Sequence, residues 1–253
     1  MGRVIAIANQ KGGVGKTTTA ISVASCLALS EQRTLLVDMD PQANATSGLG
    51  ESNKSLGKSI YDVIINNTPL GDARTRTMLA LLDLVPSRLS LVGCELELVS
   101  QPKRESKLKE AISKIKPEYR YLIIDCPPSL GLLTLNGLVA ADSVLIPIQC
   151  EFYALEGLGK LLSTVRLVQR QLNPGLAIEG VLLTMFDSRT NLSKQVLSEV
   201  RGYFKGKVFE TVIPRNVKLA EAPSFGKPII LYDALSVGAE AYLNLTKEVM
   251  KIG

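Results

Sequence analysis

The residues best suited to chemistry lie in the run NQKGGVGKTTT, which spans Asn9–Thr19. Glycines allow backbone N–H groups to turn inward and approach phosphate oxygens closely. A helix that starts at the end of such a loop adds unpaired N–H donors and the positive end of its dipole. In this arrangement the Lys16 ammonium reaches the β- and γ-phosphates, and the Thr17 hydroxyl ligates Mg²⁺. A strand pattern before the run and a helical pattern after it favour a phosphate-binding loop over a plain glycine-rich turn.

Carboxylates that could complete such a site follow two short apolar runs. Asp38 and Asp40 come after Thr34–Val37, and Asp125 comes after Tyr121–Ile124. An acidic residue at the end of a buried strand is the Walker B arrangement, which holds Mg²⁺, here through a water molecule. Many strands end in aspartate, so the pattern indicates a metal site only because a phosphate loop accompanies it. For Asp38, a role as a helix or turn cap is the open alternative.

Two loops adjoin these carboxylates. Pro127–Ser129 follows Asp125, and its two prolines make it a stiff segment that could act as a switch sensing the γ-phosphate. Asn44–Ser59 is rich in Gly, Ser, Asn and Lys and follows the Asp-Met-Asp turn. We therefore expect Asn44–Ser59 to be a mobile loop near the site rather than a domain boundary.

The elements that would position these residues alternate between short apolar runs and longer amphipathic runs. The apolar runs predict strands at Val4–Ala8, Thr34–Val37, Leu82–Val85, Leu122–Ile124, Ser143–Ile148, Ile178–Met185 and Val208–Ile213. The amphipathic runs predict helices at Thr17–Leu29, Lys103–Ile115, Leu132–Ala140, Leu155–Leu172, Leu192–Phe204 and Gly238–Lys251, and Cys94 also lies in an apolar helical pattern. This order indicates an α/β fold, with a mostly parallel, twisted sheet and helices on both faces. We expect one domain over residues 1–253.

Composition excludes several classes of function. The chain has no histidine, which rules out Ser-His-Asp and Cys-His mechanisms and histidine-ligated metals. It has no tryptophan, and aromatics make up 5%, which disfavours base-stacking platforms for single-stranded nucleic acid. The 29 basic and 24 acidic residues give a net charge of +5, which permits a polyanionic partner without requiring one.

Cysteine usage and hydropathy point to a cytoplasmic protein. No two of the cysteines at positions 26, 94, 126 and 150 have CxxC spacing, so we interpret all of them as core thiols of a reduced chain. The N-terminus lacks the long apolar segment of a signal peptide. No stretch approaches 18 uncharged apolar residues, so we expect no membrane-spanning segment.

The phosphate loop departs from the standard G-x-x-x-x-G-K-[ST] pattern, because Gln10 stands where the first glycine would be and a second lysine, Lys11, precedes Gly12. The string KGGVGKT is the deviant Walker A motif, and the chain here resembles the ParA/MinD group of P-loop ATPases. The strings DMDPQANATSGLG, DCPPSLGLLTLN, EFYALEGL and IPRNVKLAEAPSFGKPI are similar to those of chromosomal ParA proteins, often called Soj. The resemblance extends over essentially the whole chain and implies a P-loop NTPase fold.

This resemblance implies roles for individual residues. Lys11 would reach across a dimer to the partner's nucleotide, and Asp40 would orient the attacking water. These two residues and Lys16 are the catalytic set, whereas Asp38 would support the Mg²⁺ shell that Thr17 and Asp125 hold. The nucleotide-binding set adds Pro214, Arg215 and Asn216, which would pack on the adenine, to the loop residues Lys11, Gly12, Gly13, Val14, Gly15, Lys16, Thr17 and Thr18.

Basic residues of the C-terminal third are nearly balanced by acidic ones. The charges alone therefore fit an ordinary solvated surface as well as they fit a DNA-binding site. The family resemblance favours DNA contacts, because Arg189 and Lys218 stand where chromosomal ParA proteins keep basic residues. The candidate DNA-binding residues are Arg189, Arg215, Lys218, Lys227 and Lys247. Without a recognition-helix motif, such contacts would be made to phosphates, independent of sequence and sensitive to salt.

By resemblance, the expected activity is ATP hydrolysis with Mg²⁺, in a homodimer that forms on ATP binding. The dimer would bind double-stranded DNA, a ParB-type centromere-binding protein would stimulate hydrolysis, and the process would be chromosome or plasmid segregation. We expect a cytoplasmic, nucleoid-associated protein without membrane binding. One alternative is a MinD-like membrane-associated ATPase that regulates division-site placement, since the last helix is amphipathic and basic. Another is an electron-transfer ATPase like the nitrogenase iron protein, which bridges its dimer with a cysteine-held cluster.

Overall fold

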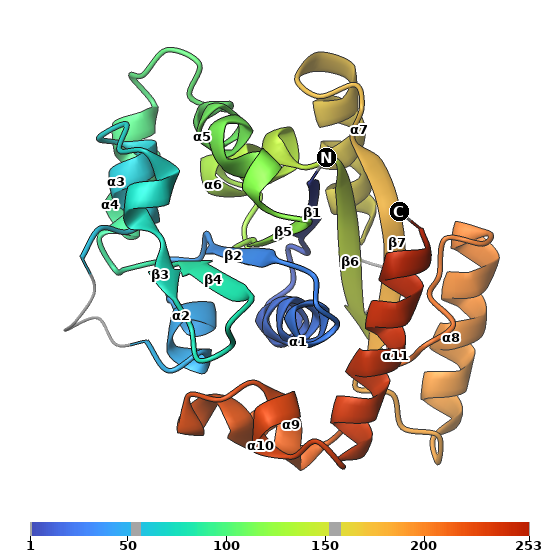
Figure 1. The fold of residues 1–253 in the computed structure, drawn as a ribbon. Coiled ribbons are helices and arrows are strands. Elements are labelled where there is room, and N and C mark those ends of the chain that lie inside the picture. The colour runs from blue at the N-terminus through green and yellow to red at the C-terminus, as the bar shows by residue number, and fades with distance from the viewer. Residues whose placement is uncertain (1, 52–56, 152–157, 253) are drawn as a thin grey trace.

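The computed structural model describes residues 2–51, 57–151 and 158–252. Within those ranges, seven strands form one sheet in the order β3-β4-β2-β5-β1-β6-β7 (Figure 1). Every neighbouring pair is parallel except the edge hairpin of β3 with β4. The strands are β1 Arg3–Ile7, β2 Thr34–Asp38, β3 Thr75–Arg76, β4 Leu82–Val85, β5 Tyr121–Asp125, β6 Ser143–Gln149 and β7 Ala177–Thr184. The predicted mostly parallel sheet is confirmed.

Helices cover both faces of the sheet, as the alternating pattern predicts (Figure 1). The core on one face takes side chains from α3 Ile60–Ile64, α4 Leu91–Leu98, α5 Lys107–Ile115, α6 Leu132–Ala140, α7 Leu158–Gln171 and α8 Asn191–Phe204. The core on the other face takes side chains from α1 Lys16–Leu29, α2 Asn44–Gly48, α10 Ile229–Tyr232 and α11 Val237–Lys251, with α9 Val217–Glu221 packed beside it. Three short 3₁₀ turns are Leu70–Ala73, Lys116–Glu118 and Ala222–Phe225.

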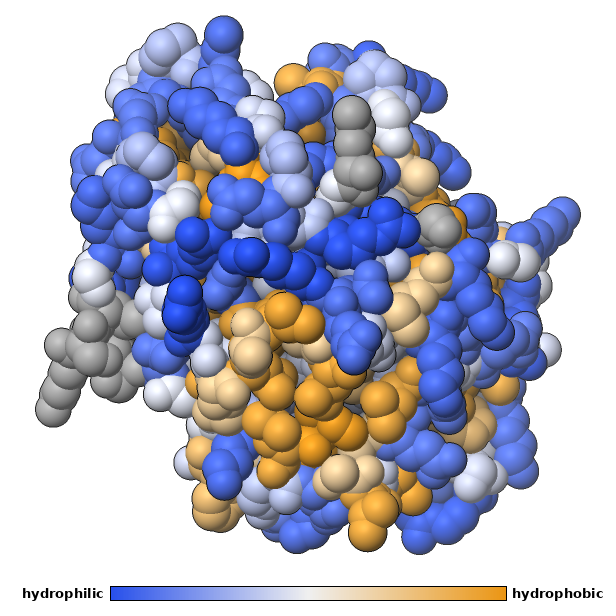
Figure 2. Space-filling view, in the orientation of Figure 1, coloured by the Kyte–Doolittle hydropathy of each residue, from blue (hydrophilic) through white to orange (hydrophobic). Residues whose placement is uncertain are grey.

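The central strand shows why the apolar runs are continuous. Along β1, Val4 and Ala6 belong to the first core, whereas Ile5 and Ile7 belong to the second. Successive side chains of a strand point to opposite faces, so a strand covered on both sides needs apolar residues at every position. Figure 2 shows apolar side chains gathered in the lower half of the molecule, where Figure 1 places α1, α10 and α11 over the second core.

The predicted strand at Val208–Ile213 is wrong. This segment runs beside β7 and bonds to that side of the sheet at its two ends, through isolated bridges at Val181–Val208 and Phe186–Pro214 and through the Ile213 N–H, which donates to the Leu183 carbonyl at 2.8 Å. Between these bridges, the backbone N–H groups of Glu210 and Thr211 donate to the Glu248 carboxylate of α11 at 2.9 Å each. Because a side chain takes these donors, no regular ladder forms there.

Other boundaries differ locally from the prediction. The expected mobile loop Asn44–Ser59 begins with helix α2, and residues 52–56 lie outside the described residues. The strand that we predicted to reach Met185 ends at Thr184, because Met185 has a left-handed backbone with φ of 52°. Helix α5 starts at Lys107 rather than Lys103, and the first three residues of the helix predicted from Leu155 lie outside the described residues.

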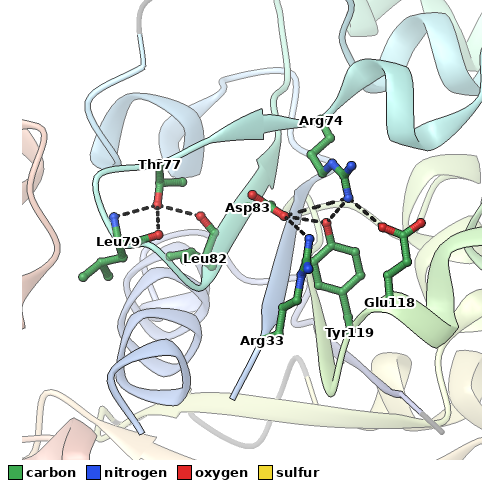
Figure 3. Close-up of polar contacts among 8 residues, drawn as sticks. All are labelled: Arg33, Arg74, Thr77, Leu79, Leu82, Asp83, Glu118 and Tyr119. Carbon is green, nitrogen blue, oxygen red and sulfur yellow. Dashed lines mark hydrogen bonds and ion pairs between the residues drawn. The ribbon is translucent and has the colours of Figure 1, made fainter. Parts of the chain in front are cut away.

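A polar cluster ties the β3–β4 hairpin to the neighbouring chain segments (Figure 3). The buried Asp83 carboxylate accepts a hydrogen bond from the Tyr119 hydroxyl at 2.6 Å and pairs with Arg33 and Arg74 at 3.7 and 4.0 Å. Thr77 closes the hairpin by donating to the Leu82 carbonyl at 2.8 Å. The full set of partners around Asp83 indicates a structural carboxylate.

The last helix packs into the body of the protein. Tyr242, Leu245 and Val249 of α11 are buried in the second core, where α11 lies against α1. The amphipathic pattern of this helix is therefore accounted for by core packing. In the part of the chain that the structure describes, no helix is both long enough and apolar enough to cross a membrane.

Candidate nucleotide site

The predicted site residues meet at the carboxyl edge of the sheet, because parallel strands end there together. Asp38 closes β2 and stands opposite Asp125, which closes the neighbouring strand β5. Asp125 also stands opposite Ile7 of β1, whose continuation is the phosphate loop. One edge of the sheet thus gathers the two carboxylates and the loop from three segments far apart in the sequence.

The loop is held from both sides. Asn9 donates to the Pro147 carbonyl of β6 at 2.7 Å, and its side-chain oxygen accepts the N–H of Lys11 at 3.1 Å. The Thr184 hydroxyl at the end of β7 donates to the Val14 carbonyl at 2.9 Å. Asn9 and Thr184 were not among the predicted site residues, and for Thr184 only its place at a strand end was a signal.

Two glycines of the loop adopt backbone conformations that suit glycine alone. Gly13 and Gly15 have φ values of 75° and 85°, in the left-handed region. A side chain at either position would be strained, and at Gly15 it would also approach Thr184 at 3.7 Å. These turns lead the chain directly into the N-terminus of α1 at Lys16, as a phosphate-binding loop requires.

Lys16 is the buried cation of the site, with 6% of its surface exposed. Its ammonium donates to the Lys11 carbonyl at 3.0 Å, which bends the side chain back over the loop. Burial lowers the pKa of Lys16, and the carboxylates of Asp125 and Asp40 oppose that shift. Among the described residues, the acceptor of the Lys16 ammonium is thus an uncharged carbonyl of the loop, which a phosphate oxygen can replace.

Asp125 differs from the other carboxylates at this edge of the sheet in its hydrogen bonding. It is fully buried, and neither carboxylate oxygen has a hydrogen-bond partner among the described residues. Burial raises its pKa well above the usual value, the charge of Asp38 adds to this, and the nearby Thr17 hydroxyl opposes it. Oxygen donors in this state match the preference of Mg²⁺ for carboxylates and hydroxyls. The residues present therefore fit the predicted magnesium ion.

Asp38 is engaged mainly with the protein. Its carboxylate accepts hydrogen bonds from the Thr46 N–H at 2.8 Å, the Thr46 hydroxyl at 2.7 Å and the Asp40 N–H at 3.1 Å. Burial raises the pKa of Asp38 to about 6, although the bonds from Thr46 work against the rise. Asp38 thus anchors the start of α2, the cap role that the sequence left open. A place in the Mg²⁺ shell stays a prediction.

Asp40 and Lys11 lie at the mouth of the site. The Asp40 carboxylate is buried and accepts the Gln42 N–H at 2.9 Å, in a tight turn beside Lys16. The Lys11 ammonium is about one-third exposed and pairs with Glu151 of the same chain at 3.5 Å. Their roles in orienting water and in reaching a partner's nucleotide stay predictions.

A cavity of about 370 Å³ adjoins the loop on the side of β7. Gly15 and Thr18 line one wall, and Pro214, Arg215 and Asn216 line another. The Asn216 side chain caps α9 by accepting the Leu219 N–H at 3.3 Å. The structure thus places the predicted adenine segment beside the phosphate loop, in a volume suited to a base and ribose. Sequence reasoning missed Met185 and Tyr242, which also line this cavity.

Most of the candidate DNA-binding cations have local partners. Arg189 binds the Asp187 carboxylate through two nitrogens at 2.9 and 2.7 Å, which raises the pKa of Arg189 and lowers that of Asp187 to about 2. Lys218 pairs with Glu221 at 3.0 Å. The remaining candidates are Arg215 at the cavity, Lys227 in a small crevice near α1, and Lys247, which donates to Asn244 at 3.3 Å.

The cysteines are all buried. Burial raises the pKa of Cys26 and Cys150 to about 11 and that of Cys94 to about 12, and it also raises the pKa of Cys126. These thiols are protonated at neutral pH. They match the core thiols that the sequence predicts.

Comparison with known proteins identifies the family. A family model described as an AAA domain matches residues 2–178. The chain is 59% identical over 251 residues to the chromosome partitioning protein ParA of Myxococcus xanthus, covering 99% of this chain and 89% of that protein. This chain belongs to the ParA/MinD family.

Two further matches show how much of the chain the similarity covers. The chain is 58% identical over 253 residues to the sporulation initiation inhibitor protein Soj of Bacillus subtilis, which covers both chains completely. In fold it resembles a Mycobacterium smegmatis protein described as cobyrinic acid a,c-diamide synthase, solved with bound ADP and magnesium. That match has a TM-score of 0.87 and 39% identity, and it covers 99% of this chain and 95% of that one. The family resemblance predicted from the deviant Walker A motif is confirmed.

Proposed function

We propose that this protein is a DNA-partitioning ATPase, which binds MgATP, dimerises around the nucleotide and holds DNA in that state. Its full-length similarity to ParA and Soj proteins supports the proposal. The observation that carries the nucleotide part is Asp125, a buried carboxylate without a hydrogen-bond partner among the described residues, close to Lys16 and Thr17. A buried charge of this kind calls for a cation. Residues 1–253 act as one ATPase domain in this proposal.

The loop and its neighbours would hold the substrate as follows. The triphosphate lies against the backbone N–H groups of the loop, and Lys16 exchanges its bond to the Lys11 carbonyl for one to phosphate. Thr17 and Asp125 hold Mg²⁺, Asp125 through a water molecule. The bound Mg²⁺ neutralises charge on the phosphate oxygens. The base lies in the cavity lined by Pro214, Arg215 and Asn216.

Hydrolysis would require Asp40 to orient the attacking water and Lys11 to act on the nucleotide of a second copy. For that step Lys11 must leave Glu151, its ion-pair partner within the chain. A partly exposed pair of this kind is worth about 1 kcal/mol or less, so its loss is a small barrier to dimerisation. A cation supplied in this way accelerates phosphoryl transfer by ~10³–10⁵ in related systems.

DNA would bind through phosphate contacts from Arg189, Arg215, Lys218, Lys227 and Lys247. Two of these cations already pair with carboxylates, Arg189 with Asp187 and Lys218 with Glu221, so DNA has to compete for them. Each copy alone would therefore bind weakly, and the dimer would gain affinity by joining two patches. A ParB-type protein would stimulate hydrolysis and release the dimer from DNA, at the nucleoid, during chromosome or plasmid segregation.

The decisive experiment is DNA binding by Asp40→Ala with ATP, with ADP and without nucleotide, over a series of salt concentrations. We expect binding with ATP alone and a steep fall of affinity with salt, since phosphate contacts release counterions. Lys16→Ala is the matched control, because it removes a different side chain of the same site and should bind no DNA in any state. Absence of DNA binding by Asp40→Ala in all three states would refute the proposal. Binding to lipid vesicles would then be the test of the MinD-like alternative.

A further inference from the structure

A carboxylate outside the predicted site touches the segment that follows Asp125. Glu95 lies on α4, and its side-chain oxygen accepts the backbone N–H of Leu133, in the first turn of α6, at 3.4 Å. A methyl group added at Gly131 would overlap the Glu95 carboxylate. The carboxylate therefore sits directly on the N-terminus of α6.

This position suits an anion. The first N–H groups of a helix have no partner within the helix, and the helix dipole places partial positive charge there. Gly131, the residue before α6, offers no side-chain cap, so Glu95 supplies the acceptor from another element. Its neighbour on the same helix, Glu97, points elsewhere and accepts from the Tyr61 hydroxyl at 3.1 Å.

The contact of Glu95 with α6 holds one end of the segment that follows Asp125. Cys126, directly after Asp125, is tied to β1 by its N–H, which donates to the Ile7 carbonyl at 3.1 Å. Pro128 and Ser129 are then exposed, and Thr134 returns to the Ser129 carbonyl at 2.6 Å. The segment between Asp125 and α6 is thus fixed at its first residue by β1 and at its end by Thr134 and Glu95.

We propose that Glu95 is a positioning residue for ATP hydrolysis: by capping α6 it sets where the loop Pro127–Ser129 lies relative to the γ-phosphate. This inference rests on the proposed function. Glu95 touches neither the phosphate loop nor the cavity that would hold the base, so its loss should leave ATP binding intact. The hydrolysis step, which needs the loop in one position, should slow down.

The experiment combines hydrogen exchange with steady-state kinetics on the full chain. In Glu95→Ala, the amides of residues 129–135 should exchange about fivefold faster than in the wild type, which corresponds to the loss of a helix cap worth about 1 kcal/mol. Its kcat for ATP should fall roughly fivefold, and its KM should stay within about twofold. Glu95→Gln keeps the acceptor oxygen and should recover most of the protection. Gly131→Ala displaces the carboxylate without altering α4 and should reproduce the defect.

Glu97→Ala is the matched control, because it removes a carboxylate two residues further along the same helix that binds the Tyr61 hydroxyl instead of α6. It should change neither the amide exchange of residues 129–135 nor kcat. Unchanged exchange in Glu95→Ala, or faster exchange with an unchanged kcat, would overturn the positioning role. A wild-type protein without ATPase activity would refute the proposed function instead. Amide exchange of residues 129–135 with and without MgATP would then decide about Glu95 alone, and equal protection in the wild type and Glu95→Ala would overturn the inference.

Discussion

Replacing Asp125 by asparagine should make the nucleotide-free protein more stable, although it removes the carboxylate that we propose as a magnesium ligand. Asp125 and Asp38 are buried on neighbouring strands, and the charge of Asp38 adds to burial in raising the pKa of Asp125. The neutral amide keeps the shape of the carboxyl group. It removes one buried charge and the repulsion between the two carboxylates.

Asp38 gives the scale of the effect, because it is buried to the same extent as Asp125. Burial raises the pKa of Asp38 from 3.8 to about 6, which corresponds to about 3 kcal/mol of destabilisation at pH 7.5, at roughly 1.4 kcal/mol per unit. Asp125 is raised in pKa by the same kind of burial and also by the charge of Asp38, so its ionisation carries a penalty of about this size, which the substitution removes. The variant loses the attraction of Asp125 for Lys16 and leaves a buried amide without partners, which costs about 1–3 kcal/mol. The net expectation is a gain of about 2 kcal/mol.

The pH dependence has a definite sign. Because both carboxyl groups have raised pKa values in the folded state, the folded protein binds more protons than the unfolded chain between about pH 4 and 7. Stability should therefore rise as the pH falls from about 7 to about 5, and this rise should shrink in Asp125→Asn. Carboxyl groups with lowered pKa values, such as Asp187 at about 2, lose their stabilising charge only below this window.

Thermal denaturation without Mg²⁺ and nucleotide measures the effect. A gain of about 2 kcal/mol raises the Tm by roughly 4–8 °C for a chain of this length. Asp83→Asn is the control, since Asp83 is also buried but has Tyr119, Arg33 and Arg74 as partners (Figure 3). That substitution should lower stability by about 1–3 kcal/mol. An Asp125→Asn protein that melts at or below the wild-type temperature would refute the reasoning, as would an undiminished gain on acidification.

Three further substitutions test other parts of the molecule. Lys11→Ala removes only a partly exposed ion pair with Glu151, so the ATP affinity measured by titration and the Tm should match those of the wild type. The rate of ATP turnover should fall by ~10³ or more. A turnover rate equal to that of the wild type would exclude the role of Lys11 across the dimer. Gly180→Ala places a methyl group 2.6 Å from the Phe209 ring, so the free energy of unfolding should fall by about 1–3 kcal/mol while ATP binding is retained. An unchanged free energy of unfolding would show that the ring can move aside. Arg189→Ala should weaken DNA binding equally for unrelated sequences and reduce the salt slope by about 1; a sequence-dependent loss would contradict a phosphate contact.

Local patterns were enough to predict most of the fold. The runs Thr34–Val37, Leu82–Val85 and Ser143–Ile148 became strands because their mostly apolar residues need cover on both faces of the sheet. The phosphate loop could be predicted for a similar reason: its glycines, lysine and threonines act through the backbone of one short segment. The confirmed family membership rests on strings of the same local kind.

Patterns failed where a distant side chain decides the backbone. Val208–Ile213 has the composition of a strand, yet Glu248 from the last helix takes two of its N–H groups. Asn44–Gly48 has the composition of a loop, yet Asp38 binds Thr46 within it and the segment is helical. No window of sequence contains both partners of the first contact, so no periodicity could reveal it.

By itself, the sequence determined the family, the parallel sheet and the identity of the side chains that would handle phosphate and metal. These depend on residue type, on spacing within one loop, and on the alternation of apolar runs. The tertiary structure alone decided which of those side chains have partners: Asp38 and Asp83 are satisfied by the protein, whereas no described residue satisfies the Asp125 carboxylate. Asp38 and Asp125 end strands and Asp83 lies within β4, and each stands beside apolar residues in the sequence. The groups that folding brings next to each carboxylate decide whether it has partners within the protein.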